Sequence, residues 1–257
     1  MKRIVVVMPC YNRQDLCSNT INSILKYGYE NCEIVVVDDA SDTPFVYDND
    51  RVHIIRIDKK DKKWFNSVIP YNYGLLYAIN ELNAEIIVTQ NAEGYHYGNI
   101  LQHINENLNP NEYFSYACLS VDESFGEVSV AKISQICDKI QNAASGGIEL
   151  GWYNHSVLYP RAYDFCSAMY VEQMIKLNGF EERFYNHTWY GDDNFLIRVK
   201  KLGLKVSIID EPFVVHQWHS RSHQPFGHTD ASFQLLNKTI KEDSYSATHK
   251  FTKNLYE

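Results

Sequence analysis

The sequence predicts an α/β fold in which a mainly parallel, Rossmann-like central sheet is flanked by helices. Residues 33–37 are expected to form a strand, and positions 34–37 are an apolar run without polar alternation, which is typical of a strand buried on both faces. Residues 4–8 and 85–89 repeat this pattern, and segments with helical spacing lie between the runs. In such sheets a ligand binds outside the carboxyl ends of the strands, so we expect the functional side chains there.

Composition narrows the class of protein. Of the 257 residues 45% are hydrophobic and 22% are charged, which is ordinary for a globular protein. The formal net charge of -8 argues against nucleic acid as a partner. No stretch approaches the roughly 20 apolar residues of a spanning helix, and the six cysteines lack paired spacing. We therefore expect a cytoplasmic protein with reduced thiols. Association with the membrane surface and homo-oligomer formation both stay open.

The first half of the chain alternates strands and helices. Pro9 ends the first strand, and apolar residues then recur at helical spacing over residues 14–27. A second helix follows Gly74. The apolar runs predict strands at 4–8, 33–37, 52–57 and 85–89. Because two of these strands run directly into acids, polar groups should gather at one edge of the sheet.

The second half continues without a repeat or a low-complexity linker. Residues 149–155 form an aromatic segment that we expect to be a loop. The patterns predict a strand at 113–121, a late strand at 205–209, and helices at 100–108, 133–140, 172–177 and 189–202. We expect one compact domain over 1–225, divided functionally at about residue 115, and a helical tail over 226–257.

The order of five motifs resembles that of GT-A fold nucleotide-sugar glycosyltransferases, specifically the inverting family 2. The resemblance covers residues 3–220. It rests on the segments 8–13 (MPCYNR), 37–41 (VDDAS), 91–93 (NAE), 178–184 (NGFEERF) and 191–193 (GDD) with Arg198. It implies that residues 1–115 bind the nucleotide sugar and that 116–225 hold the acceptor and the catalytic group. The implied reaction transfers a hexose or hexosamine, from a UDP-sugar above all, to a glycan or glycolipid.

The resemblance also implies the donor contacts. A carboxylate suits nucleobase recognition because it accepts from an N–H donor such as the imide of uracil, whereas Asp38 is expected to brace the loop. Alternatively, Asp39 only caps the turn after its strand. The residues expected to contact the donor nucleotide are Pro9, Tyr11, Arg13, Asp39, Asn72 and Asn91.

A divalent ion, Mn²⁺ or Mg²⁺, is implied on the donor diphosphate. The family's acidic D-x-D element corresponds to Asn91-Ala92-Glu93, so Glu93 is expected to bind the metal together with His216. Because Asn91 replaces an acid, free metal should bind weakly and depend on the nucleotide. His219 and Arg221 are expected on the diphosphate. The alternative is that Glu93 is a surface acid and His216 a structural histidine.

The family's catalytic base stands six residues before the helix arginine, which here places it at Asp192. Gly191 replaces the usual glutamate, so Asp193 is the second choice. The base takes the proton of the attacking acceptor hydroxyl, and a helix N-terminus favours its ionised form. Alternatively, both acids only stabilise the start of the helix.

The acceptor or sugar side is expected to include aromatic and amide side chains, since apolar sugar faces stack on rings. These are Trp152, Asn154, His155 and Trp189, although aromatic residues can equally fill the core. Two other functions stay open. A sugar nucleotidyltransferase would usually carry a glycine-rich loop after the first strand, and this chain lacks one. A non-catalytic glycan-binding subunit would explain Asn91 and Gly191.

Overall fold

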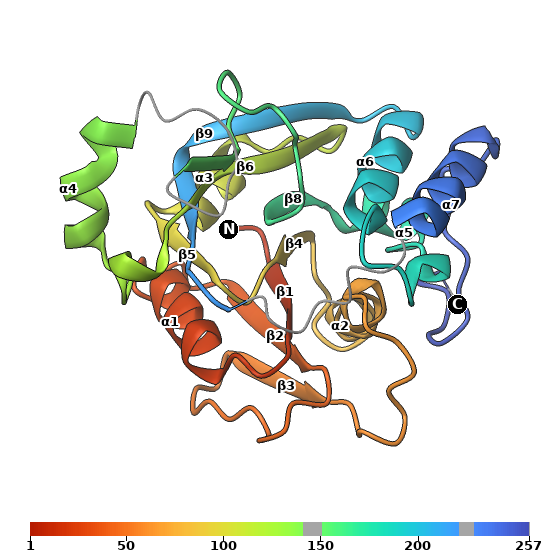
Figure 1. Ribbon diagram of the computed structural model, residues 1–257, viewed down its shortest axis with the longest axis horizontal. Helices are drawn as coiled ribbons and strands as arrows, with labels where there is room; N and C mark the ends of the chain where they lie inside the picture. The colour runs from red at the N-terminus through yellow and green to blue at the C-terminus, as the bar shows by residue number, and fades with distance from the viewer. Residues whose placement is uncertain (141–150, 221–228, 257) are drawn as a thin grey trace.

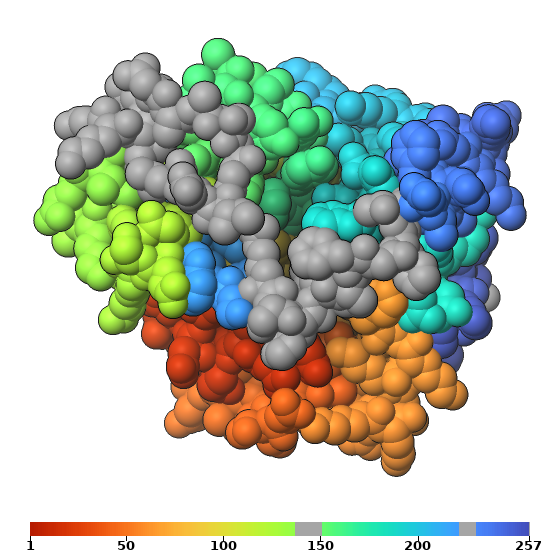
Figure 2. All heavy atoms as spheres, viewed as in Figure 1, coloured from red at the N-terminus to blue at the C-terminus, as the bar shows by residue number. Residues whose placement is uncertain are grey.

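The computed structural model describes residues 1–140, 151–220 and 229–256. Within these residues one nine-stranded sheet runs through both halves of the chain, in the order β3-β2-β1-β4-β8-β6-β9-β5, with β7 paired to β6 (Figure 1). In Figure 2, the first part of the chain, drawn in red and orange, fills the lower part of the visible face, and later segments lie above it and on both sides. The two halves of the chain therefore meet along one continuous sheet.

The first half is a parallel sheet, as predicted. Its strands pair in parallel because each connection carries the chain back to the end of the sheet where the strands begin. Two of these connections contain a helix, α1 (Gln14–Leu25) or α2 (Val68–Asn80). The strands are β1 (Ile4–Cys10), β2 (Cys32–Asp38), β3 (Val52–Arg56) and β4 (Ile86–Gln90). Asp38 pairs with Cys10 in register, so both strands end at the same level.

The second half extends the sheet with mixed pairing. β8 is antiparallel to β4 and β6, while β9 is parallel to β6 and antiparallel to β5. The strands are β5 (Gly94–Tyr97), β6 (Glu112–Ser120), β7 (Gly151–Asn154), β8 (Cys166–Tyr170) and β9 (Lys205–His216). The helices are α3 (Ile100–Asn107), α4 (Val130–Ile140), α5 (Val171–Leu177), α6 (Gly191–Lys201) and α7 (Thr229–Lys241), with single 3₁₀ turns at Glu123–Phe125 and Glu182–Phe184.

Four strands differ from the prediction. β5 and β8 were not predicted, β9 runs on to His216 rather than ending at residue 209, and the aromatic segment contains β7 rather than a loop. These strands depend on partners far away in the chain, since β5 pairs with β9, β7 with β6, and β8 with β4 and β6. Short local patterns do not report such pairings.

Both faces of the sheet are buried. Val5 and Val7 pack in one cluster with α2, α5, α6 and α7, whereas Ile4, Val6 and Met8 pack with α1 and α3 on the other side. Figure 1 shows α5, α6 and α7 grouped at one end of the molecule and α1 and α4 at the other. This double burial explains the uninterrupted apolar runs of the first half.

Helix α2 approaches the sheet closely at Gly74. A Cβ atom at this position would lie 2.4 Å from Cγ1 of Val7 and 3.0 Å from Cγ2 of Val37. Glycine removes that clash, and the helix can therefore rest directly on β1 and β2.

The C-terminal segment belongs to the same core. The side chains of Leu236 and Leu255 are buried in the cluster that contains α2 and α6. The predicted helix from residue 230 is confirmed as α7. Over the described ranges, no helix combines the length and the apolarity needed to cross a membrane.

Candidate active site

The end of β2 carries two acids with different surroundings. Asp38 is fully buried and accepts hydrogen bonds from the backbone N–H groups of Ser41 (3.0 Å) and Phe45 (2.8 Å), and it pairs with Arg56. Burial alone would raise the pKa of Asp38, but these hydrogen bonds hold it below its usual value. Asp38 therefore braces the loop after the strand.

Asp39 lies beside the exposed ring of Tyr11. One carboxylate oxygen of Asp39 is 2.8 Å from Nζ of Lys62, and the other accepts from Nε1 of Trp64 at 2.9 Å. The Lys62 ammonium also lies 3.8 Å from the centre of the Tyr11 ring. Burial raises the pKa of Asp39 in spite of Lys62. Pro9, at the end of β1, pairs with Val37, so Pro9, Tyr11 and Asp39 share one end of the parallel sheet.

A second cluster lies where β4 leads into β5. The side chains of Glu93, His216 and His219 each offer one ligand atom, and these atoms lie within 4.8 Å of one another. Antiparallel pairing of β5 with β9 places His216 opposite Gly94, and the N–H of Gln217 donates to the carbonyl of Glu93 at 2.9 Å. Sheet pairing thus joins residues that are more than 120 positions apart.

Glu93 is a buried carboxylate among cationic and imidazole groups. Its Oε1 lies 3.2 Å from Nε2 of His216 and 3.5 Å from Nε2 of His219, and its Oε2 lies 2.9 Å from a guanidinium nitrogen of Arg13. Burial raises the pKa of Glu93, but Arg13 and the two histidines together hold it well below its usual value. An ionised carboxylate with two imidazoles is a donor set that fits a divalent transition ion. His219, expected on the diphosphate, thus lies with the metal candidates.

Asn91 points toward a different neighbour. The side-chain oxygen of Asn91 accepts from the hydroxyl of Tyr71 at 3.1 Å, and the backbone N–H of Asn91 donates to the backbone carbonyl of Phe165 at 3.0 Å. The Tyr71 ring stacks on Phe180 with centroids 4.6 Å apart. Asn91 therefore connects the end of β4 to the segment that precedes β8.

The expectation that Asn72 contacts the donor is not supported. Its side chain is fully buried, its oxygen accepts from the N–H of Phe180 (2.8 Å), and its amide donates to the carbonyl of Phe180 (2.9 Å) and to Glu182 (3.2 Å). A buried amide with these partners holds the motif at 178–184 against α2, and contact with a ligand would break those bonds.

Asp192 and Asp193 stand in the first turn of α6, and Asp192 accepts from the N–H of Asp193 at 3.0 Å. Burial and the charge of Asp193 raise the pKa of Asp192 to about 6. Burial also raises the pKa of Asp193, against the effect of Arg161. A base of this kind is ionised near neutral pH and still accepts a proton readily.

A third acid, Asp164, was missed by the sequence analysis. It precedes β8, and burial together with the charge of Asp192 raises its pKa to about 7. Two carboxyls that interact this strongly titrate as a pair. No motif marks Asp164, because its interaction with Asp192 joins segments that are 28 positions apart in the chain.

Arg198 explains how the start of α6 is held. Its guanidinium donates to the carbonyls of Leu177 and Gly179, both at 2.9 Å, and its Nε donates to Asn194 at 2.9 Å. Asn194 in turn donates to Thr239 of α7 at 2.9 Å. This buried network fixes α6 against the 178–184 motif and so positions Asp192.

Two of the four residues expected on the acceptor side lie in the core. Asn154 is fully buried and bonds to Ser115, to the carbonyl of Tyr116 and to the N–H of Ala162. Trp152 is 7% exposed and packs on Phe213. Both side chains are therefore enclosed by the protein in this structure, and their role on the acceptor side stays a prediction.

The other two are more accessible. Nδ1 of His155 accepts weakly from the N–H groups of Val157 and Leu158 at 3.2 and 3.3 Å, and it lies 3.7 Å from Asp210. Trp189 is 42% exposed and immediately precedes the αL residue that opens α6. Trp189 is thus an exposed ring three residues before Asp192 in the chain. Arg221 lies outside the described residues.

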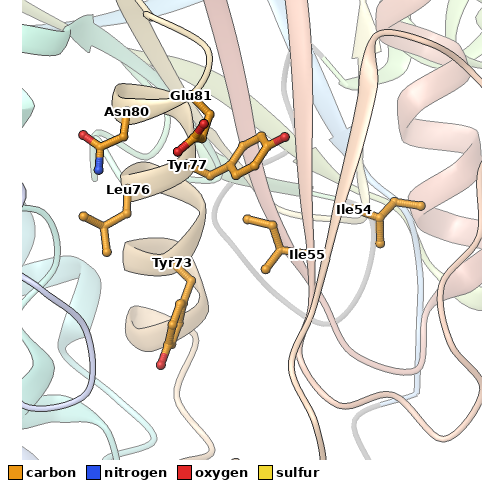
Figure 3. A pocket seen from close by; sticks show the side chains of 7 residues that line it. All are labelled: Ile54, Ile55, Tyr73, Leu76, Tyr77, Asn80 and Glu81. Carbon is orange, nitrogen blue, oxygen red and sulfur yellow. The ribbon is translucent and has the colours of Figure 1, made fainter.

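A separate hollow of about 440 Å³ lies between α2 and the edge strand β3 (Figure 3). Ile55, Tyr73 and Tyr77 line it, with Glu81 as its one acid. None of the expected site residues borders it, so we do not associate it with the chemistry.

Comparisons with known proteins agree with this geometry. The family model described as glycosyl transferase family 2 matches residues 5–146. No curated protein is significantly similar to the chain. The structure of S. aureus TarS residues 1–349 with UDP-GlcNAc superimposes with a TM-score of 0.63 at 14% identity, over 93% of this chain and 66% of that one.

A second similar structure is the mannosyltransferase PcManGT from Pyrobaculum calidifontis with GDP-Man and Mn²⁺. Its TM-score is 0.51 at 15% identity, over 86% of this chain and 58% of that one. This chain therefore spans less than two thirds of the length of either structure. Because the family model matches more than half of the residues, the chain belongs to glycosyl transferase family 2, and the family and GT-A fold class expected from its motifs are confirmed.

Proposed function

We propose that this protein transfers a hexose or hexosamine from a nucleotide sugar, a UDP-sugar first of all, to a glycan or glycolipid acceptor with inversion at the anomeric carbon. The observation that supports this most is the convergence of Glu93, His216 and His219 within 4.8 Å. The names of two similar structures agree, since one holds UDP-GlcNAc and the other GDP-Man and Mn²⁺. We place the reaction in the cytoplasm, where a glycolipid acceptor would be met at the membrane surface.

The donor would bind along the edge formed by β1, β2 and β4. The exposed ring of Tyr11 can stack on the base, and Asp39 can accept a base N–H beside Trp64 and Lys62. The diphosphate would then lie toward Glu93 and His219, with Arg221 as a further phosphate contact. Two imidazoles favour a transition ion such as Mn²⁺ over Mg²⁺, which prefers oxygen ligands.

Asp192 would act as the general base. As the acceptor hydroxyl attacks the anomeric carbon from the side opposite the diphosphate, Asp192 takes its proton, and the configuration inverts. Bound metal would offset the charge that builds on the leaving diphosphate. Trp189 would present its ring to the sugar or the acceptor, and Arg198 would keep Asp192 in place through the start of α6.

The test is turnover of a panel of nucleotide sugars with Mn²⁺, with the products followed by mass spectrometry and NMR. We expect slow release of sugar and nucleoside diphosphate from one donor, and inverted product once an acceptor is supplied. Asp192→Asn should lower turnover by roughly 10²–10⁴-fold and leave nucleotide binding unchanged. Retained turnover in this variant would remove Asp192 from the role of base.

Two results would contradict the proposal as a whole. Turnover that depends on pyrophosphate would indicate a sugar nucleotidyltransferase. Absence of turnover with every donor, together with binding of glycans, would indicate a non-catalytic subunit. This is the alternative that Asn91 and Gly191 favour. Glu93→Gln supplies a matched check, because it should weaken metal-assisted nucleotide binding without changing the shape of the side chain.

A further inference from the structure

Arg13 already forms an ion pair with Glu93, the carboxylate that the metal would need. One guanidinium nitrogen lies 2.9 Å from Oε2 of Glu93, and the other lies 3.2 Å from Nδ1 of His219. Arg13 follows β1 and Glu93 follows β4, 80 positions later in the chain. Arg13 therefore contacts two of the three metal candidates at once.

The guanidinium of Arg13 opposes the binding of a divalent ion at Glu93. Arginine keeps its positive charge at every accessible pH and offers only donors, so it cannot become a ligand. Arg13 pairs with Oε2 of Glu93, while Oε1 faces the two histidines, so a metal ion and the guanidinium would lie on the same carboxylate and repel each other. Metal binding at Glu93 is therefore weakened as long as the Arg13 side chain stays in place.

Arg13 is also the partner that can move. Its side chain is 31% exposed, whereas the side chain of Glu93 is 6% exposed. Glu93 is held in place by His216 at 3.2 Å and, through its backbone carbonyl, by Gln217 at 2.9 Å. The Arg13 side chain is long, flexible and partly exposed, and within the described residues its guanidinium contacts Glu93 and His219.

A diphosphate is the group that would draw Arg13 away. Guanidinium forms bidentate hydrogen bonds with phosphate oxygens, and the diphosphate is expected beside Glu93 and His219. We propose that Arg13 is a resident counter-ion of the metal site, which neutralises Glu93 in the free protein and moves to the donor diphosphate when it binds. Metal and nucleotide then bind cooperatively, and Mn²⁺ alone binds weakly. This inference rests on the proposed function.

The test measures Mn²⁺ binding alone, by electron paramagnetic resonance of free Mn²⁺, with and without UDP. In the unaltered protein, UDP should tighten Mn²⁺ binding by roughly tenfold or more, within the usual range of coupling between sites. Arg13→Gln should bind Mn²⁺ alone roughly tenfold more tightly than the unaltered protein, and UDP should then add less. Arg13→Lys, which keeps the charge, should resemble the unaltered protein.

Arg51→Gln is the matched control. Arg51 lies at the opposite end of the sheet and donates to the carbonyl of Tyr29, so this change removes the same charge away from Glu93. Melting curves of each variant confirm folding. Unchanged Mn²⁺ affinity in Arg13→Gln, with Mn²⁺ and UDP still binding together, would overturn the role of Arg13 and leave the proposed function intact. Absence of Mn²⁺ binding with UDP in every variant would instead contradict the metal site itself.

Discussion

At the scale of single residues, burial separates acids that look alike in the sequence. Asp38 and Asp39 are neighbours, yet Asp38 braces a loop through backbone N–H groups, while Asp39 faces Lys62 and Trp64. Likewise, burial and the charge of Asp193 raise the pKa of Asp192. Whether the pKa of an acid is lowered or raised depends on whether hydrogen bonds to its ionised form or the loss of solvent on burial has the larger effect.

The pH dependence of turnover distinguishes Asp192 from Asp193. With the pKa of Asp192 at about 6, the base is protonated below that pH and turnover should fall on the acid side. Asp193→Asn removes a charge that raises this pKa, so the acid limb should move to lower pH while turnover persists. The measurement is the pH profile of kcat/KM. Loss of turnover in Asp193→Asn would make Asp193 the base.

Asp164 should destabilise the protein at high pH. Its pKa is raised to about 7 from 3.8, so the folded state binds more protons than the unfolded state between these values. Stability is then lost as the pH rises through this window. Asp164→Asn should raise the free energy of unfolding by about 1–3 kcal/mol at pH 8 and have little effect at pH 4, as measured by urea denaturation. An equal effect at both pH values would show that charge is not the cause.

At the scale of elements, the packing of α2 and α6 against neighbouring segments positions the residues of the candidate site. α2 rests on β1 and β2 at Gly74, and Tyr71, one turn earlier, reaches Asn91. α6 is held by Arg198, which joins it to the carbonyls of the 178–184 motif. Gly74 and Arg198 thus influence the site through packing and hydrogen bonds rather than through contact with a ligand.

Gly74→Ala should destabilise the protein. A helical alanine normally gains up to about 1 kcal/mol over glycine, but overpacking against Val7 and Val37 costs about 1–3 kcal/mol, and the clash at 2.4 Å should prevail. We expect a lower midpoint of thermal unfolding. Asn80→Ala, at an exposed position of the same helix, is the control and should change little. A gain in stability from Gly74→Ala would mean that α2 can shift freely on the sheet.

At the scale of the whole molecule, the C-terminal segment closes over the 178–184 motif. Glu182 accepts from the N–H groups of Lys250 and Phe251 at 2.6 Å, and Asn178 accepts from the N–H of Leu255 at 2.8 Å. The hydroxyl of Thr248 donates to Glu181 at 2.7 Å. The segment thus adds hydrogen bonds to buried acids that are also held by Arg183 and Asn72. Whether residues 226–257 form a unit apart from 1–225 stays a prediction.

Removal of residues 243–257 should therefore destabilise the entire fold. It would leave Glu181 and Glu182 buried with fewer hydrogen-bond donors, and each lost hydrogen bond to a charged group costs about 1.5–3 kcal/mol. The measurement is the thermal midpoint, with a chain that ends at Leu255 as the control, because Tyr256 is 63% exposed. An unchanged midpoint for the longer deletion would show that the segment is dispensable.

The sequence by itself determined the parallel first half, the family and the candidate acids, because uninterrupted apolar runs and motif order are local properties. Only the tertiary structure decided which side chains meet. It buried Asn72, Asn154 and Trp152, and it brought Asp164 close enough to Asp192 for their charges to interact. It also joined Arg13 to Glu93, because contacts between distant loops depend on how the whole sheet is assembled.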